Sequence, residues 1–281
     1  MTTQDTNSRS TDSRKYDDEL FQGTAHWYET YRPRYVPDLY KHLSAQFHLE
    51  DDAQILDLGC GTGFLARGLA PHVGHVFALD PDSEMLDEAR KAASSECLDN
   101  ITWIQGEAET LPSKIDNLSL TTIGTAFHWM HQEKVLNDLY GRTHPGGGVA
   151  IITNRWNYWK DNSKEHTIPW KKRRIELVQR FLGDMRRAGK GIAHLDTGEL
   201  FESVLMRSPF SRFQTWEVSF EHVWTVDTLL GLLYSTSFGR RSYFGDKLAE
   251  FEGVFRNEML EVEPSGTFVD TITTNALLAW K

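Results

Sequence analysis

Short apolar runs alternate with amphipathic segments along the first half of the chain. Five runs have the length and composition of buried strands, and they lie at residues 54–58, 76–80, 101–105, 118–124 and 149–153. Three segments with apolar side chains at helical spacing separate them, at residues 64–70, 83–93 and 133–142. Residues 145–148, Pro-Gly-Gly-Gly, predict a turn before the fifth strand. This alternation is typical of a parallel sheet with helices on both faces.

The pattern changes after Thr153. Residues 154–200 carry many aromatic side chains and then a basic, helix-like run. Four further elements follow: a strand at 213–223, helices at 226–237 and 247–260, and a last strand at 271–280. We therefore expect the sheet to be completed by strands that come late in the sequence.

These patterns divide the chain into five segments. Polar residues rich in Ser, Thr and Asp predict a disordered leader at the N-terminus. A helical lid, a nucleotide-binding core, a helical insertion that caps the substrate and a part that completes the sheet follow it. The five segments are residues 1–15, 16–50, 51–153, 154–205 and 206–281.

Three glycines follow the first predicted strand, at positions 59, 61 and 63. Glycine at such a turn lets a ligand approach the backbone and the next helix N-terminus. Counted from Gly59, the spacing departs from the dinucleotide pattern G-x-G-x-x-G. Counted from Gly61 it reads G-x-G-x-x-A and ends at Ala66, an accepted variant. Spacing alone therefore leaves the nucleotide cofactor open.

Asp80 ends the second predicted strand. Its carboxylate suits two ribose hydroxyls as a bidentate acceptor. The alternative is that Asp80 caps the next helix.

The segments 55–63, 106–112, 126–129 and 145–147, together with Asp80, resemble the class I S-adenosylmethionine (SAM)-dependent methyltransferases of the small-molecule type. The resemblance covers roughly residues 50–153, with the motifs in the correct order. It implies an α/β, Rossmann-like seven-stranded sheet with helices on both faces and an antiparallel last strand. It also implies SAM as the cofactor.

The resemblance also implies roles for individual residues. Asp57 orients the glycine loop, and the methionine part of SAM lies along Gly59, Cys60 and Gly61. Asp80 holds the ribose. The adenine is expected near Pro81, Glu107 and Ala108, and the sulfonium near Thr125 and Ala126. From the lid, Tyr28 or Arg32 contacts the SAM carboxylate or the substrate.

His128 follows the fourth strand, where the SAM methyl should point. A neutral imidazole can accept the proton of a hydroxyl acceptor, so His128 is the candidate catalytic base and favours O-methylation over C- or N-methylation. It can equally be a packing residue. Four aromatic residues are expected to line the substrate site, or else to fill the core: Trp27, Tyr31, Trp129 and Trp156.

A basic run at residues 171–174 has two interpretations. It can grip a carboxylate or phosphate of the substrate. The favoured alternative is the solvated face of a helix, because apolar residues beside it give an amphipathic pattern.

The composition indicates which kinds of binding partner to expect. The formal charge of −10 is unusual for a general nucleic-acid binder, and no apolar run approaches the roughly 20 residues of a membrane span. Two cysteines without a zinc spacing, and no signal peptide, favour a cytoplasmic protein without a metal.

We therefore predict a methyltransferase that acts on a small molecule and binds neither nucleic acid nor membrane. The alternatives are a SAM-binding module or non-methylating enzyme on the same fold and, less favoured, a nicotinamide-dependent oxidoreductase.

Overall fold

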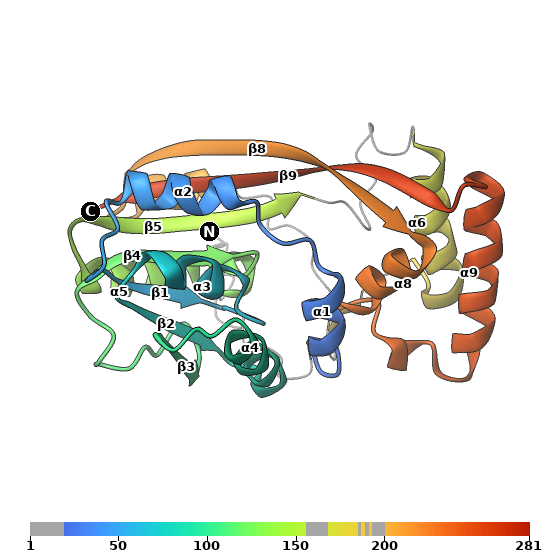
Figure 1. Ribbon diagram of the computed structural model, residues 1–281, viewed down its shortest axis with the longest axis horizontal. Helices are drawn as coiled ribbons and strands as arrows, with labels where there is room; N and C mark the ends of the chain where they lie inside the picture. The colour runs from blue at the N-terminus through green and yellow to red at the C-terminus, as the bar shows by residue number, and fades with distance from the viewer. Residues whose placement is uncertain (1–19, 156–167, 185–186, 189–190, 193–199) are drawn as a thin grey trace, which may run out of the picture.

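A seven-stranded sheet forms the centre of the computed structural model (Figure 1). The structure describes residues 20–155, 168–184, 187–188, 191–192 and 200–281. The strands are ordered β3-β2-β1-β4-β5-β9-β8. They span Gln54–Leu58 (β1), His75–Asp80 (β2), Ile101–Gln105 (β3), Leu118–Gly124 (β4), Thr143–Arg155 (β5), Arg212–Thr225 (β8) and Thr267–Trp280 (β9). β1 to β5 are parallel, and β9 lies antiparallel between β5 and β8. The predicted fold class is confirmed.

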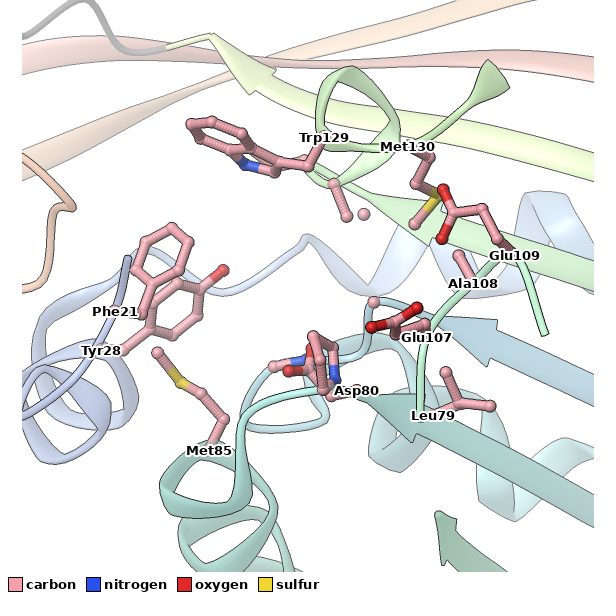
Figure 2. A pocket seen from close by; sticks show the side chains of 16 residues that line it. Phe21, Tyr28, Leu79, Asp80, Met85, Glu107, Ala108, Glu109, Trp129 and Met130 are labelled. Carbon is pink, nitrogen blue, oxygen red and sulfur yellow. The ribbon is translucent and has the colours of Figure 1, made fainter. Parts of the chain in front are cut away.

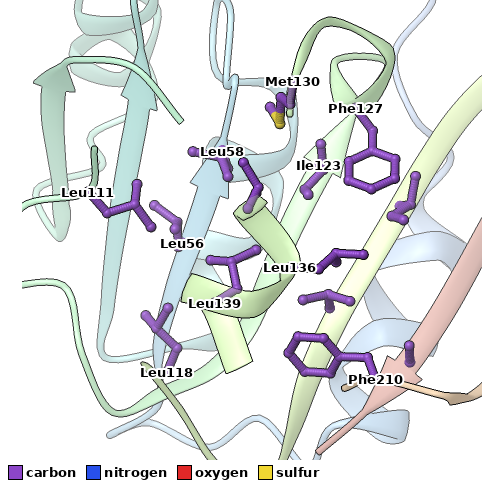
Figure 3. Close-up of a cluster of buried hydrophobic side chains, with 14 of the residues drawn as sticks. Leu56, Leu58, Leu111, Leu118, Ile123, Phe127, Met130, Leu136, Leu139 and Phe210 are labelled. Atoms are coloured by element: carbon purple, nitrogen blue, oxygen red, sulfur yellow. The ribbon is translucent and has the colours of Figure 1, made fainter. Parts of the chain in front are cut away.

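Helices cover both faces of the central strands, and side chains that alternate along β1 therefore enter two different core clusters. On one face, Leu56 and Leu58 lie with side chains of α5 (Gln132–Arg142) (Figure 3), and α7 (Phe201–Arg207) adds side chains to the same cluster. On the other, Ile55 packs with α2, α3 and α4. These helices span Pro37–Gln46, Phe64–Leu69 and Ser83–Ser95. Near-continuous apolar runs in the sequence reflect this two-sided burial.

The predicted turn at residues 145–148 is wrong, because β5 already begins at Thr143. Thr143 pairs with Leu118, and after a register shift Gly148 pairs with Leu120. Two of the glycines are needed for close packing: a Cβ on Gly147 would lie 2.8 Å from the carbonyl oxygen of Leu118, and one on Gly148 would lie 2.0 Å from that of Ala279. Glycine here therefore permits the close approach of β4, β5 and β9. The sequence pattern alone had predicted a turn, because glycine and proline are also the usual residues of turns.

The C-terminal part forms a second body of packed helices beside the sheet. β8 and β9 continue beyond the shorter strands and carry α6 (Pro169–Leu182), α8 (Val226–Tyr234) and α9 (Leu248–Val262) (Figure 1). Their apolar side chains form a third core cluster. The predicted insertion is thus split, because α6 packs here whereas α7 packs on the main sheet. Two short strands, Arg187–Ala188 (β6) and Gly191–Ile192 (β7), pair with each other.

The basic run at 171–174 is not simply a solvated face. Lys171 is 4% exposed and Arg174 2% exposed. The Nζ of Lys171 lies 2.6 Å from Oδ1 of Asp270 on β9. A buried charge needs such a partner, so the pair fixes α6 against the long strand. Lys172 and Arg173 do face solvent, as predicted.

The two helices of the predicted lid segment, residues 16–50, pack against different parts of the structure. α2 lies against the sheet, with Leu39 and Leu43 fully buried. Helix α1 (Ala25–Tyr31) instead lies between the sheet and the C-terminal helices, and it contacts α4 and α8 (Figure 1). A Cβ on Gly231 of α8 would lie 2.3 Å from the Tyr31 ring, so the small residue allows α1 to dock.

We expect Gly231→Ala to lower the free energy of unfolding by roughly 1–3 kcal/mol, because the new methyl overpacks the α1–α8 contact. Gly253→Ala in α9 is the matched control, since a Cβ there meets nothing within 4 Å. It should stabilise by about 0.5–1 kcal/mol through helix propensity. Urea denaturation measures both, and equal effects of the two substitutions would refute the close α1–α8 contact.

Candidate active site

A pocket opens at the carboxyl ends of β1, β2 and β4 (Figure 2), the edge at which open α/β sheets bind ligands. Sixteen residues line it. Ten were predicted from the sequence: Tyr28, Gly59, Gly61, Asp80, Pro81, Glu107, Ala108, Thr125, Ala126 and Trp129. The structure therefore brings most of the candidate residues together from separate segments of the chain.

The glycine loop has a backbone that other residues adopt with difficulty. Gly59, Gly61 and Gly63 have φ values of 68°, 55° and 82°, all in the left-handed region. A Cβ on Gly59 would lie 2.6 Å from Cβ of Ala126. The N–H groups of Gly59 and Cys60 donate to the carbonyl of Leu79 at 2.8 and 3.0 Å. The loop is thus tied to β2 and open to a ligand on its other side.

Asp80 connects β2 to this loop. Its Oδ2 accepts the N–H of Gly61 at 2.8 Å, and its Oδ1 accepts the N–H of Asp82 at 2.9 Å. Burial raises the pKa of Asp80 to about 6, although both hydrogen bonds oppose this. The helix-capping alternative is wrong: Asp82 caps α4, accepting the N–H groups of Glu84 and Met85.

Asp57 lies beneath the loop and is fully buried. Its Oδ2 accepts the N–H of Ala66 at 2.9 Å, and its Oδ1 accepts the hydroxyl of Thr122 at 2.9 Å. Burial raises the pKa of Asp57 to about 7. Because Ala66 is in the first turn of α3, Asp57 caps the helix that follows the glycine loop. It does not line the pocket, so it reaches a ligand only through the loop.

Helix α1 contributes Tyr28 to the pocket, opposite the glycine loop. A Cβ on Gly61 would lie 3.9 Å from the Tyr28 ring. Two interactions hold the helix in place. Nη2 of the buried Arg67 of α3 donates to both carboxylate oxygens of Glu29, at 2.8 and 2.9 Å. Arg32 stacks on the Tyr28 ring at 4.4 Å and donates to the hydroxyl of Ser235 at 2.9 Å.

Several predicted residues lie away from the pocket lining. The thiol of Cys60 is buried in the core, which raises its pKa. Trp27 and Tyr31 stack on each other at 5.5 Å against the C-terminal helices. His128 is exposed, with its ring 4.6 Å from that of Trp129. Trp156 lies outside the described residues.

Six lining residues escaped the sequence analysis: Phe21, Leu79, Met85, Glu109, Gly124 and Met130. Leu79, Glu109, Gly124 and Met130 are sequence neighbours of predicted site residues, and Met85 lies in the first turn of the helix that follows Asp80. Their proximity to the motifs could therefore have identified them. Phe21 has no such signal. The charged lining side chains among the described residues are all carboxylates: Asp80, Glu107 and Glu109.

The sequence matches a family model described as a methyltransferase domain over residues 55–147. An uncharacterized methyltransferase of Schizosaccharomyces pombe is 30% identical over 196 residues, covering 69% of this chain and 72% of the relative. A methyltransferase-like protein of the same organism is 28% identical over 212 residues, covering 75% of each. A solved structure of a candidate type II methyltransferase from Anaeromyxobacter dehalogenans shares the fold, with a TM-score of 0.55 at 20% identity, over 89% of this chain and 97% of that one.

The chain therefore belongs to the class I SAM-dependent methyltransferases, and its cofactor is SAM. This assignment excludes the nicotinamide-dependent alternative. Among the described residues, no helix is both long and apolar enough to span a membrane.

We expect Asp57→Asn to remove a pH-dependent part of the folding stability. Because the folded-state pKa is raised, Asp57 stabilises the fold fully below about pH 4, and this contribution is lost as the pH rises through about 7. The difference in unfolding free energy between wild type and variant should fall over that range and then stay constant. Urea titrations at intervals from pH 4 to pH 8 measure it.

The exposed Asp116→Asn is the control and should leave the pH profile unchanged. If the unfolding free energies of wild type and the Asp57→Asn variant differ by a constant amount from pH 4 to pH 8, that result contradicts the buried, protonatable state of Asp57.

Proposed function

We propose that this protein transfers the methyl group of SAM to a small-molecule acceptor, with O-methylation favoured over C- and N-methylation. The observation that carries the proposal is the pocket in which the glycine loop and Asp80 face Thr125, Ala126 and Trp129. Bound SAM supplies a methyl already activated by the sulfonium. The residues then have to align donor and acceptor for in-line displacement.

The residues fit SAM on two structural grounds. Each carboxylate oxygen of Asp80 accepts a backbone N–H and keeps acceptor capacity for a ribose hydroxyl. The left-handed glycines leave the loop backbone accessible, and side chains there would narrow the site. We assign the methionine part to Gly59 and Gly61, and the adenine to the region of Pro81, Glu107 and Ala108.

The charges of the pocket support an acceptor that is neutral or cationic. The described lining carries carboxylates and no Lys, Arg or His side chain. Because Glu107 is assigned to the adenine, Glu109 is the carboxylate that an anionic acceptor would approach, and like charges repel each other. Aromatic side chains of Phe21, Tyr28 and Trp129 (Figure 2) support an acceptor with apolar surface.

A direct test incubates the protein with methyl-labelled SAM and size-fractionated cell extract. We expect label in a product of low molecular mass, together with S-adenosylhomocysteine. Label in protein or nucleic acid would contradict the small-molecule acceptor. Tight SAM binding without label in any product would favour the alternative, a SAM-binding module or non-methylating enzyme on the same fold.

We expect Asp80→Asn to weaken SAM binding at least tenfold at pH 7.5, which is about 1.4 kcal/mol, because a charge-assisted acceptor for the ribose is lost. Wild-type affinity should also fall as the pH drops below about 6, since protonation converts Asp80 to the weaker acceptor. Isothermal titration calorimetry from pH 5 to pH 8 measures both effects.

The control for this test is Asp82→Asn, because Asp82 is buried nearby, caps α4 and does not line the pocket. Its SAM affinity should match wild type. Unchanged affinity in Asp80→Asn would overturn the ribose assignment.

His128 stays the proposed base, although it lies outside the pocket lining, with its ring beside that of the lining residue Trp129. His128→Ala should lower turnover at least about tenfold, or about 1.4 kcal/mol in the barrier, with SAM affinity nearly unchanged. Steady-state kinetics with the acceptor found in the extract assay measures this. His131→Ala, at the start of α5, is the control. Preserved turnover would mean that His128 is structural or that the nucleophile needs no base.

A further inference from the structure

Thr125 has an unfavourable backbone conformation at the centre of the candidate site. Its φ is +53°, in the left-handed region that β-branched residues avoid. Three other non-glycine residues of the described chain share a positive φ, at His48, Cys97 and Asn117, but none of these lines this pocket. Strain of this kind persists only where the surrounding structure imposes it.

Two interactions impose it here. The N–H of Thr125 donates to the carbonyl of Ile152 at 2.8 Å, which continues the pairing of β4 with β5 up to this residue. The hydroxyl of Tyr35, a residue between α1 and α2, lies beside Gly124, the residue before Thr125, and is electrostatically coupled to the Thr125 side chain. Burial raises the pKa of Tyr35, so the phenol is neutral at physiological pH.

Tyr35 is itself held by close packing. A Cβ on Gly124 would lie 2.9 Å from the Tyr35 hydroxyl and 2.7 Å from Cδ1 of Leu65. Only glycine at position 124 therefore leaves room for the phenol beside the end of β4. The Tyr35 hydroxyl is thus placed within reach of Thr125 by packing on a neighbouring residue and not by Thr125 alone.

The left-handed turn determines where the next residues lie. It directs the chain out of the sheet and into the short 3-10 helix η2 (Phe127–Trp129). Ala126 then closes against Gly59, and the N–H of Trp129 donates to the Ala126 carbonyl at 2.9 Å. Figure 2 shows Trp129 across the pocket from Asp80. The φ of Thr125 therefore sets the gap between the glycine loop and the Ala126–Trp129 side of the pocket.

We propose that Thr125, held by Tyr35, is a positioning residue that fixes the orientation of the SAM methyl toward the acceptor. This inference rests on the proposed function and on the expectation, implied by the family resemblance, that the sulfonium lies near Thr125 and Ala126. The strained turn keeps the two sides of the pocket at a fixed separation. A relaxed turn leaves SAM bound through Asp80 and the glycine loop, but with a mobile methyl group.

Four substitutions separate positioning from simple stability. Thr125→Gly relieves the strain and frees the turn. Tyr35→Phe keeps the ring but removes the hydroxyl that reaches Thr125. Thr125→Ser is the conservative variant, since it retains the hydroxyl. Cys97→Gly is the matched control, because it relieves a left-handed φ of 57° at an exposed residue that does not line the pocket.

The readout is the proton–carbon correlation spectrum of SAM carrying a ¹³C-labelled methyl group, bound to each full-length protein. In wild type, the bound methyl should give one resonance displaced from free SAM by nearby aromatic rings. Thr125→Gly and Tyr35→Phe should each lose at least half of this displacement or broaden the resonance. Their SAM dissociation constants should stay within about threefold of wild type by calorimetry. Thr125→Ser and Cys97→Gly should keep the wild-type resonance.

A wild-type methyl resonance in both Thr125→Gly and Tyr35→Phe would overturn the proposal. So would a tenfold or larger loss of SAM affinity in these variants with no change in the resonance of the bound methyl, since that result describes a cofactor-binding residue. The proposed function fails by a different observation, the absence of label in any small-molecule product. If that absence accompanies the expected resonance pattern, Thr125 and Tyr35 still order the bound methyl group, but the transfer to an acceptor and the orientation toward it both fall.

Discussion

The site depends on the hydrogen bonds between two buried carboxylates, Asp57 and Asp80, and the backbone at the glycine loop and the helix that follows it. Asp57 accepts the N–H of Ala66 and thereby caps α3, and Asp80 accepts the N–H of Gly61. Burial raises the pKa of both groups. Carboxylates in such surroundings are costly unless they are hydrogen-bonded, so each is satisfied by backbone groups that the loop must present in one conformation. The loop is fixed before any ligand arrives.

The rest of the pocket comes from distant parts of the chain. Helix α1 covers the glycine loop because Glu29 pairs with the buried Arg67 and Arg32 donates to Ser235 of the C-terminal part. Gly231 permits the close approach of α1 to α8. The glycine loop and Asp80 are therefore positioned by the sheet. Helix α1, which lies over the loop, is positioned by its packing against the C-terminal helices.

The pocket lining combines three carboxylates, Asp80, Glu107 and Glu109, with apolar and aromatic side chains. Among its described lining residues the charged groups are carboxylates, which suits a cofactor with a sulfonium and supports an acceptor without negative charge. On the side opposite Asp80, the chain leaves β4 through the strained Thr125. Among the described residues that line this pocket, Asp80 holds the glycine loop by a backbone hydrogen bond, and Thr125 is the non-glycine residue with a positive φ.

The sequence by itself determined the order of the strands and helices, the glycine loop, Asp80 and ten of the pocket residues. The strands and helices follow from the local period of apolar residues, whereas most of the pocket residues are implied by the resemblance of their motifs to the class I SAM-dependent methyltransferases. Tertiary structure decided the rest. It buried Lys171 against Asp270, turned the Pro145–Gly148 segment into strand, and left His128 exposed beside Trp129. It also brought Phe21 into the pocket and Tyr35 to Thr125. Such outcomes depend on contacts between residues far apart in sequence, and no local pattern encodes which distant partner a side chain will meet.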